Sequence, residues 1–220
     1  MHTLLTVSRL ALLTTALAIA GCASTSPSIY ADIDSSARLV PNTEDDAYRV
    51  PYIYKANVDW RQYSAVIVEP VRLYQGPDNQ FGDMALADRL TLAQYMQHRF
   101  SDRLQQHFKL THRAAPNALR VKLTLTGAQT TTTFLSTFTR FDLAGGPYNI
   151  VQSIRGKEGT FTGSVSYAVE IYDSTSNRLL NAYVTKQYPN SLNISATFGA
   201  LGAAKTGIDK GADTLVSQFE

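Results

Sequence analysis

The stretch "LRVKLTLT", residues 119–126, decides the fold of this chain. Its odd positions hold leucine or valine, and its even positions hold arginine, lysine or threonine. This period of two predicts a β-strand with one buried face and one face in solvent. A second alternating run lies at residues 165–172, followed by the turn "DSTSN" and the returning run "RLLNAYVTKQY". Two runs joined by such a short polar turn indicate an antiparallel hairpin.

Two stretches with helical periodicity flank these strands, at about residues 84–108 and at residues 198–219. The apolar stripe of the first consists of Leu86, Leu90, Ala93, Met96, Phe100, Leu104 and Phe108, and that of the second of Phe198, Leu201, Ile208, Leu215 and Phe219. The second stretch also holds four glycines, each costing a helix about 1 kcal/mol relative to alanine. We expect close packing on a sheet to compensate for them.

The order of elements predicts the fold class. An almost continuous apolar run at residues 64–73 predicts a strand covered on both faces. It precedes the first helix, and the alternating strands and the second helix follow. We therefore predict an α+β fold, a mostly antiparallel sheet with the helices at about 84–108 and 198–219 packed on one face.

The only cysteine, Cys22, ends an apolar run at residues 10–20 that is too short to span a membrane but suits a secretory signal. The boundary "IAGC" (Ile19, Ala20, Gly21, Cys22) resembles the bacterial lipobox. The resemblance implies cleavage between Gly21 and Cys22 and a diacylglycerol on the thiol, which anchors a protein without spanning the bilayer. Ala23 then implies sorting to the outer membrane, where the lipid-anchored chain is expected to face the periplasm. The alternative is an inert thiol in an ordinary signal peptide or an uncleaved anchor.

Composition divides the chain into a lipoprotein signal peptide at residues 1–21, a flexible tether at 22–50 and one globular domain at 51–220. The tether is predicted because serine, threonine, proline and acidic residues are mixed there without the periodicity of a helix or a strand. The 20 basic and 18 acidic side chains give a net charge of +2, which argues against a nucleic-acid partner.

Motifs with possible chemistry are incomplete. The stretch "GALGAAKT" at 199–206 departs from a phosphate-binding loop because Ala204 replaces the second glycine, so we predict no nucleotide and expect small residues that pack a helix on a sheet. His98 and His107 are too far apart for a helical zinc pair, and Asp102 beside His98 is expected on a solvated face. We predict no metal, no cofactor and no enzyme activity.

Two surfaces remain as candidates for a partner. Arg113, Arg120 and Lys122 form a basic stripe, for which we favour protection of a sheet edge over an anionic ligand. Segment 134–158 is too long for a simple turn, and Arg140, Tyr148 and Arg155 in it are of types enriched at interface hot spots. The alternative is that the apolar side chains of this segment cap the core.

Several blocks in the same order, among them "YSAVIVEPVRLY", "LRVKLTLTGAQTTTT", "NAYVTKQYP" and "GIDKGAD", resemble the proteobacterial lipoprotein family catalogued as domain of unknown function 3313. The resemblance covers residues 39–219. It implies a lipobox-bearing envelope protein and carries over no catalytic residue.

Three functions are open from the sequence. The first is an outer-membrane-anchored envelope lipoprotein with a periplasmic, non-enzymatic scaffolding or accessory role. The second is a binding module for an envelope glycan, lipid or peptide, and the third is an unrecognised hydrolase. A pocket with converging polar side chains would favour the second or third, and a flat sheet face the first.

Overall fold

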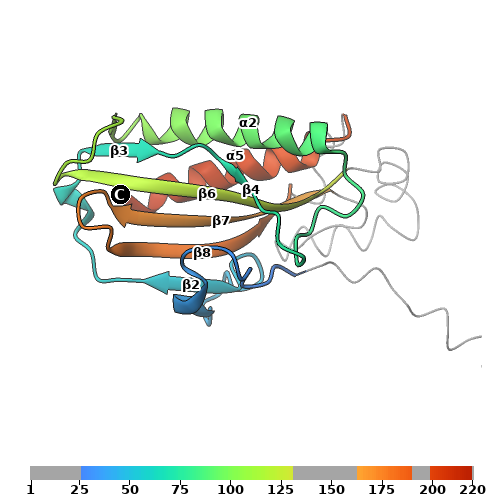
Figure 1. Cartoon of the computed structure of the whole chain (residues 1–220), viewed down its shortest axis with the longest axis horizontal. Coiled ribbons are helices and arrows are strands. Elements are labelled where there is room, and N and C mark those ends of the chain that lie inside the picture. The colour runs from blue at the N-terminus through green and yellow to red at the C-terminus, as the bar shows by residue number, and fades with distance from the viewer. Residues whose placement is uncertain (1–25, 131–162, 190–198, 220) are drawn as a thin grey trace, which may run out of the picture.

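The computed structural model describes residues 26–130, 163–189 and 199–219, which form one sheet and two helices (Figure 1). In chain order the elements are the 3₁₀ turn η2 (Ser36–Arg38), strands β1 (Val40–Pro41) and β2 (Tyr52–Lys55), turn η3 (Trp60–Gln62), strands β3 (Ala65–Val68) and β4 (Arg72–Leu73), helix α2 (Leu86–Leu104), strands β5 (Lys109–Leu110), β6 (Ala118–Gln129), β7 (Ser164–Asp173) and β8 (Leu179–Gln187), helix α5 (Gly202–Val216) and turn η5 (Ser217–Phe219).

The long strands β6, β7 and β8 form the centre of an eight-stranded sheet. Its order is β1-β2-β8-β7-β6-β3-β5, and β4 pairs with β6 beyond the end of β3. The pairs among β1, β2, β8, β7 and β6 are antiparallel, whereas β3, β4 and β5 join in parallel. The strand predicted at residues 119–126 is confirmed as part of β6, and the hairpin around "DSTSN" is confirmed by the direct pairing of β7 with β8. The face of β6 that was expected in solvent is covered instead, because Thr124 and Thr126 are buried.

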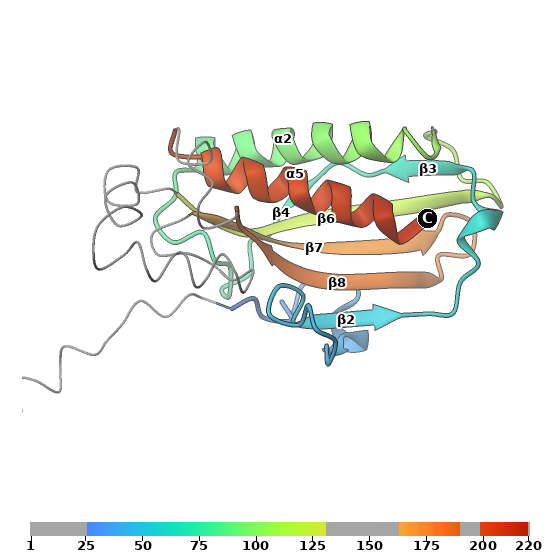
Figure 2. The same ribbon diagram turned by 180° about the vertical axis from the view of Figure 1, so that it is seen from behind.

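Both helices pack on the same face of the sheet, as Figure 2 shows from behind, so the predicted α+β class is confirmed. The odd-numbered side chains from Leu119 to Leu125 of β6 and from Val165 to Ile171 of β7 point toward the helices and are fully buried with Met96, Phe100 and Ile208. The helices are also joined by charge, because Arg99 Nε lies 2.6 Å from a carboxylate oxygen of Asp209. The Tyr95 hydroxyl donates to the same carboxylate.

The glycines of α5 permit the close packing that the sequence required. A Cβ at Gly207 would lie 2.9 Å from the backbone oxygen of Gln187 on β8, and a Cβ at Gly211 would overlap the Tyr167 hydroxyl. Contact of this kind leaves no room for a methyl group. Glycine lowers the helix propensity at these two positions, and the close contact between the helix and the sheet explains why it stands there.

The first strand run and the first helix differ from the prediction in their bounds and burial. The run at 64–73 is two short strands, because Pro70 has no N–H for the ladder and the Val71 N–H donates to Gln97 on α2 instead. Helix α2 ends at Leu104 rather than at residue 108. Leu86 and Leu90 are 63% and 47% exposed, so the apolar stripe of α2 is buried only from Leu92 onward.

The structure replaces the predicted tether with packed chain over residues 26–50. We call residues 26–41 the N-terminal segment; it crosses the outer face of the sheet, which is the face opposite the helices. Tyr30, Ile33 and Leu39 are buried there against a second apolar cluster from β7 and β8. The buried carboxylate of Glu170 accepts a hydrogen bond of 2.6 Å from the Ser35 N–H. These apolar contacts explain why a composition typical of a linker is folded here.

Candidate functional site

A cleft forms where the sheet is wider than its two helices can cover. Neighbouring strands are about 4.8 Å apart and packed helices about 8–10 Å apart, so each helix covers roughly two strands. Helix α2 packs over β3 and β4, and α5 packs over β7 and β8. The strip along β2 and the outer side of β8 therefore lies beside α5 without a helix above it, as Figure 2 shows.

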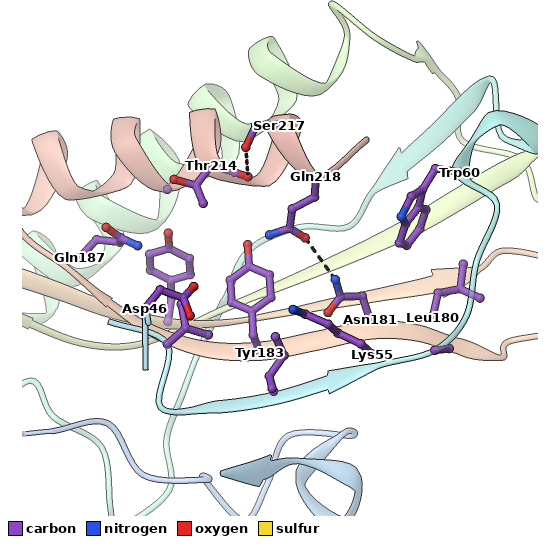
Figure 3. Close-up of a pocket in the computed structure, with 15 residues that line it drawn as sticks. Asp46, Lys55, Trp60, Leu180, Asn181, Tyr183, Gln187, Thr214, Ser217 and Gln218 are labelled. Atoms are coloured by element: carbon purple, nitrogen blue, oxygen red, sulfur yellow. Dashed lines mark hydrogen bonds between the residues drawn. The ribbon is translucent and has the colours of Figure 1, made fainter. Parts of the chain in front are cut away.

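This strip holds a cleft of about 390 Å³ (Figure 3). Tyr183 and Asn181 on β8 lie at its floor, and Gln218 and Thr214 project from the C-terminal end of the helical wall. The chain between residues 46 and 60 closes the opposite side. At about 30 Å³ for each water molecule, the volume suits a ligand of about a dozen non-hydrogen atoms.

The strand pattern explains why polar side chains converge there. Asn181 and Tyr183 lie on the helix-facing side of β8, while the alternate residues Ala182 and Val184 belong to the outer cluster. The pairing of β7 with β8 is irregular between Ile171 and Tyr172, and Leu180 is the extra residue that also lines the cleft. An irregularity of this kind redirects side chains beside it.

Three buried polar atoms at the floor have no hydrogen-bond partner among the described residues. They are the hydroxyls of Tyr183 and Tyr167 and the side-chain oxygen of Asn181. The Asn181 nitrogen, in contrast, donates to the Gln218 side-chain oxygen over 3.1 Å. Buried polar groups in native proteins are nearly always bonded to protein or to another molecule, so these atoms mark a place with unused hydrogen-bonding capacity.

Burial fixes the protonation state of the two phenols. Removal from water raises the pKa of Tyr183 well above its usual value, and the neighbouring Gln218 side chain only partly opposes this. Burial also raises the pKa of Tyr167, with a further contribution from Tyr183. Both hydroxyls are therefore neutral at physiological pH and can donate as well as accept a hydrogen bond.

Charged groups lie at the mouth of the cleft rather than on its floor. The Lys55 ammonium is 2.6 Å from a Glu44 carboxylate oxygen, and both side chains are about half exposed. Asp46 is exposed and accepts a hydrogen bond from Asn42. The hydroxyls of Thr214 and Ser217 donate to backbone oxygens of α5, at Lys210 and Thr214 respectively.

One end of the cleft is formed by Trp60, the only tryptophan of the chain. The Asp59 side chain caps turn η3 by accepting from the Arg61 N–H, which places the indole. The indole contacts Phe219 edge to face, with ring centroids 5.1 Å apart. The C-terminal turn η5 thus helps to position the aromatic end of the cleft.

Several predicted positions lie outside the described residues. These are the lipobox residues Ile19, Ala20, Gly21 and Cys22 and the partner-surface residues Arg140, Tyr148 and Arg155. The structure therefore tests neither the lipidation nor the partner surface, and both stay predictions.

Other candidates fall within the structure and have local roles. His98 Nδ1 lies 2.9 Å from Asp102 on a face where the histidine is 75% exposed, as expected for a solvated surface. In the phosphate-loop-like stretch, Ala204 is buried against the sheet and the Lys205 ammonium lies over the Tyr95 ring, so helix packing accounts for it.

The edge-protection interpretation of the basic stripe is wrong, because β6 lies inside the sheet. Lys122 Nζ is instead 2.6 Å from an Asp34 oxygen of the N-terminal segment. Arg120 lies over the Tyr172 ring and 3.5 Å from Glu69. The Lys122–Asp34 ion pair thus holds the N-terminal segment to the outer face of the sheet.

The sequence reasoning did not find the cleft. Its residues come from positions 46 to 218, and their spacing follows no local motif. The one local signal is Asn181 in the otherwise apolar start of β8, where a polar side chain takes a helix-facing position.

The described part of the chain has no cluster of three or more residues of metal-ligating type, and none of its helices combines the length and hydropathy needed to cross a membrane. Its architecture defines the class: a mixed sheet with two helices on one face and a polar cleft beside the second helix. The chain belongs to the family described as a protein of unknown function, DUF3313, whose family model matches residues 29–215.

A comparison with curated proteins found no match. Among solved structures, the chain is similar to the PelC dodecamer from Paraburkholderia phytofirmans, with 11% identity, a TM-score of 0.37 and coverage of 72% of this chain and 93% of that chain. It is also similar to a putative neuraminyllactose-binding hemagglutinin homolog from Helicobacter pylori, with 6% identity, a TM-score of 0.31 and coverage of 75% and 84%. At these TM-scores neither similarity supports an inference about the function of this chain.

Proposed function

We propose that this chain is a lipid-anchored lipoprotein of the bacterial outer membrane whose periplasmic domain binds an envelope component in the cleft beside α5. The observation that carries the binding role is the set of converging polar groups at the cleft floor, from Tyr183, Asn181 and Gln218. This role is one form of a non-enzymatic accessory function in the envelope.

The cleft side chains favour binding over hydrolysis. The two hydroxyls on its helical wall, Thr214 and Ser217, already donate to backbone oxygens. The Tyr183 phenol has a raised pKa, the opposite of what an activated nucleophile requires. Amides and neutral phenols hold and orient a ligand, which is the task of a binding module.

Site-specific photo-crosslinking in cells tests the binding role. A photoreactive residue at Asp46 or at Thr214, on opposite sides of the mouth, is expected to capture the same envelope component. A matched control at Lys109, exposed on the opposite edge of the sheet, is expected to capture none of it. Capture of the same component from Lys109, or of nothing from either cleft position, contradicts the proposal.

The anchoring part rests on the "IAGC" boundary and has its own test. Replacing Cys22 by serine removes the thiol that would carry the lipid. The variant is expected to lose sedimentation with the outer membrane and to keep its signal peptide. Normal processing and unchanged fractionation would show that the lipid prediction is wrong.

A further inference from the structure

The cleft floor presents unused hydrogen-bonding groups of a defined kind. The three atoms without a protein partner belong to side chains that are more than nine-tenths buried, with exposures of 5% for Tyr183, 7% for Asn181 and 0% for Tyr167. All three residues line the cleft. Each phenol can both donate and accept, and the amide oxygen can accept.

A ligand that satisfies these groups must carry at least one donor, for the Asn181 oxygen, and further polar groups that pair with the two phenol hydroxyls. Hydroxyl groups can serve in both roles, and a polyhydroxylated ring offers several of them in fixed positions. A fatty acyl chain in the same place would leave the three buried polar atoms without a partner, which is unfavourable. The floor thus favours a polyhydroxylated ligand over an acyl chain.

The charges around the cleft favour a ligand without charge. Among the residues that the structure describes, Lys55 is the only lysine or arginine that lines the cleft, and its ammonium is already paired with Glu44. The one acidic lining residue, Asp46, is at the exposed mouth. The nearest further cation, Arg49, donates to the Gln187 side-chain oxygen and lies over the Tyr188 ring, so its charge is already engaged by protein groups. A charged group at the floor would therefore lie mainly among neutral amides and phenols, which compensate poorly for its desolvation.

The remaining lining gives the site an apolar side. Trp60, Leu180 and Ile53 line the cleft together with the polar floor. A pyranose ring has polar hydroxyls at its edge and apolar C–H groups on its faces, so it matches both surfaces. Its size is that of a ligand of about a dozen non-hydrogen atoms, which the volume of about 390 Å³ accommodates.

We propose that this cleft binds an uncharged pyranose sugar, either free or as one residue of a glycan chain. This inference rests on the proposed binding function and specifies its ligand class. Tyr183 and Asn181 bond the ring hydroxyls, and the Trp60 end of the cleft contacts an apolar face.

Trp60 supplies a direct measurement, because the only tryptophan of the chain lines the cleft. The full chain is purified in lauryldimethylamine oxide, a detergent without a sugar headgroup, and its tryptophan emission is titrated. The probes are glucose and N-acetylglucosamine as free sugars, and maltotriose and chitotriose as glycan chains. A saturable change with at least one probe is expected, and a lower Kd for a trisaccharide than for its monosaccharide identifies the chain as the source.

Two variants separate binding from folding. Tyr183→Phe removes a hydroxyl that has no protein partner among the described residues, so it is expected to weaken sugar binding about 5-fold and to leave the melting temperature unchanged or higher. Tyr95→Phe is the matched control, because its hydroxyl donates to Asp209 away from the cleft. It is expected to lower the melting temperature and to leave the sugar Kd unchanged.

Absence of a saturable response to all four probes overturns the inference, and so does a Kd that Tyr183→Phe leaves unchanged. A response to lysophospholipid or to a peptide in place of sugars also overturns it. Failure here is distinguishable from failure of the proposed function. If the Asp46 and Thr214 crosslinkers still capture a common non-sugar component, the binding module stands and only the sugar class is wrong.

Discussion

Replacing Gly211 by alanine tests how closely α5 packs on the sheet. A Cβ at this position would overlap the hydroxyl oxygen of Tyr167 and lie 2.8 Å from Cζ of the same ring. The ring is fully buried and contacts Phe100 edge to face, with ring centroids 5.7 Å apart. The added methyl group must therefore displace the ring or the helix.

The expected magnitude follows from two opposing effects. Overpacking a core costs about 1–3 kcal/mol, and direct overlap places Gly211→Ala at about 2–3 kcal/mol. Alanine returns about 1 kcal/mol of helix propensity, so the net destabilisation is about 1–2 kcal/mol. Tyr167→Phe removes the overlapping oxygen, and because no described residue bonds it, this change alone is expected within about 0.5 kcal/mol of wild type.

Urea denaturation of the wild type, both single variants and the double variant measures the coupling. The double variant is expected to regain at least half of the loss, a coupling energy of about 1 kcal/mol. Gly207→Ala is the matched control, because its Cβ would meet Val165 and the Gln187 backbone, so Tyr167→Phe should not rescue it. Additive effects of Gly211→Ala and Tyr167→Phe, or a stabilising Gly211→Ala, would refute the reasoning.

Two further predictions concern the N-terminal segment. Glu170→Gln is expected to destabilise the fold by about 1.5–3 kcal/mol in urea denaturation, because the buried carboxylate accepts hydrogen bonds from the Ser35 N–H and the Tyr172 hydroxyl. The control Glu44→Gln changes an exposed carboxylate and should cost less than about 1 kcal/mol. Equal losses of stability in the two variants would contradict the role of burial. The hydrogen bond from Lys122 lowers the pKa of Asp34 below 3.8, so Asp34 contributes stability above about pH 4 that is lost as the pH falls through its folded-state pKa. Asp34→Asn should therefore be less stable than wild type at pH 7, by less than about 1 kcal/mol because Asp34 is half exposed. The two proteins should become equally stable once the pH has fallen below the folded-state pKa of Asp34, and a difference that persists in strong acid would exclude this cause.

The helix-facing half of the fold was predictable because its signals are local. Period-two alternation in β6 and β7 and helical periodicity in α2 place apolar side chains on one side of each element, and burial of that side requires the layers observed. The glycines of α5 also predicted close packing, because their unfavourable helix propensity has to be compensated by contact with a neighbouring surface.

The outer face and the cleft were not predictable in the same way. Glu170 and Lys122 occupy polar positions of alternating strands, which indicate solvent, and only contacts with Ser35 and Asp34 show that the N-terminal segment covers them. Nothing in the local sequence around Ser35 identifies a partner far along the chain. The cleft depends on the width of the sheet relative to its helices, a property of the assembled layers.

The N-terminal segment also sets how far the domain can move from a membrane. The Gln80 side chain donates to the Ser26 oxygen, and Tyr30 is buried, so the chain is held to the domain from residue 26 onward. If Cys22 carries the proposed lipid, the four residues from there to Ser26 reach at most about 14 Å, far less than the predicted tether over residues 22–50 would allow. The domain would then stay at the lipid surface and sample only ligands in the first layer of the periplasm beside it.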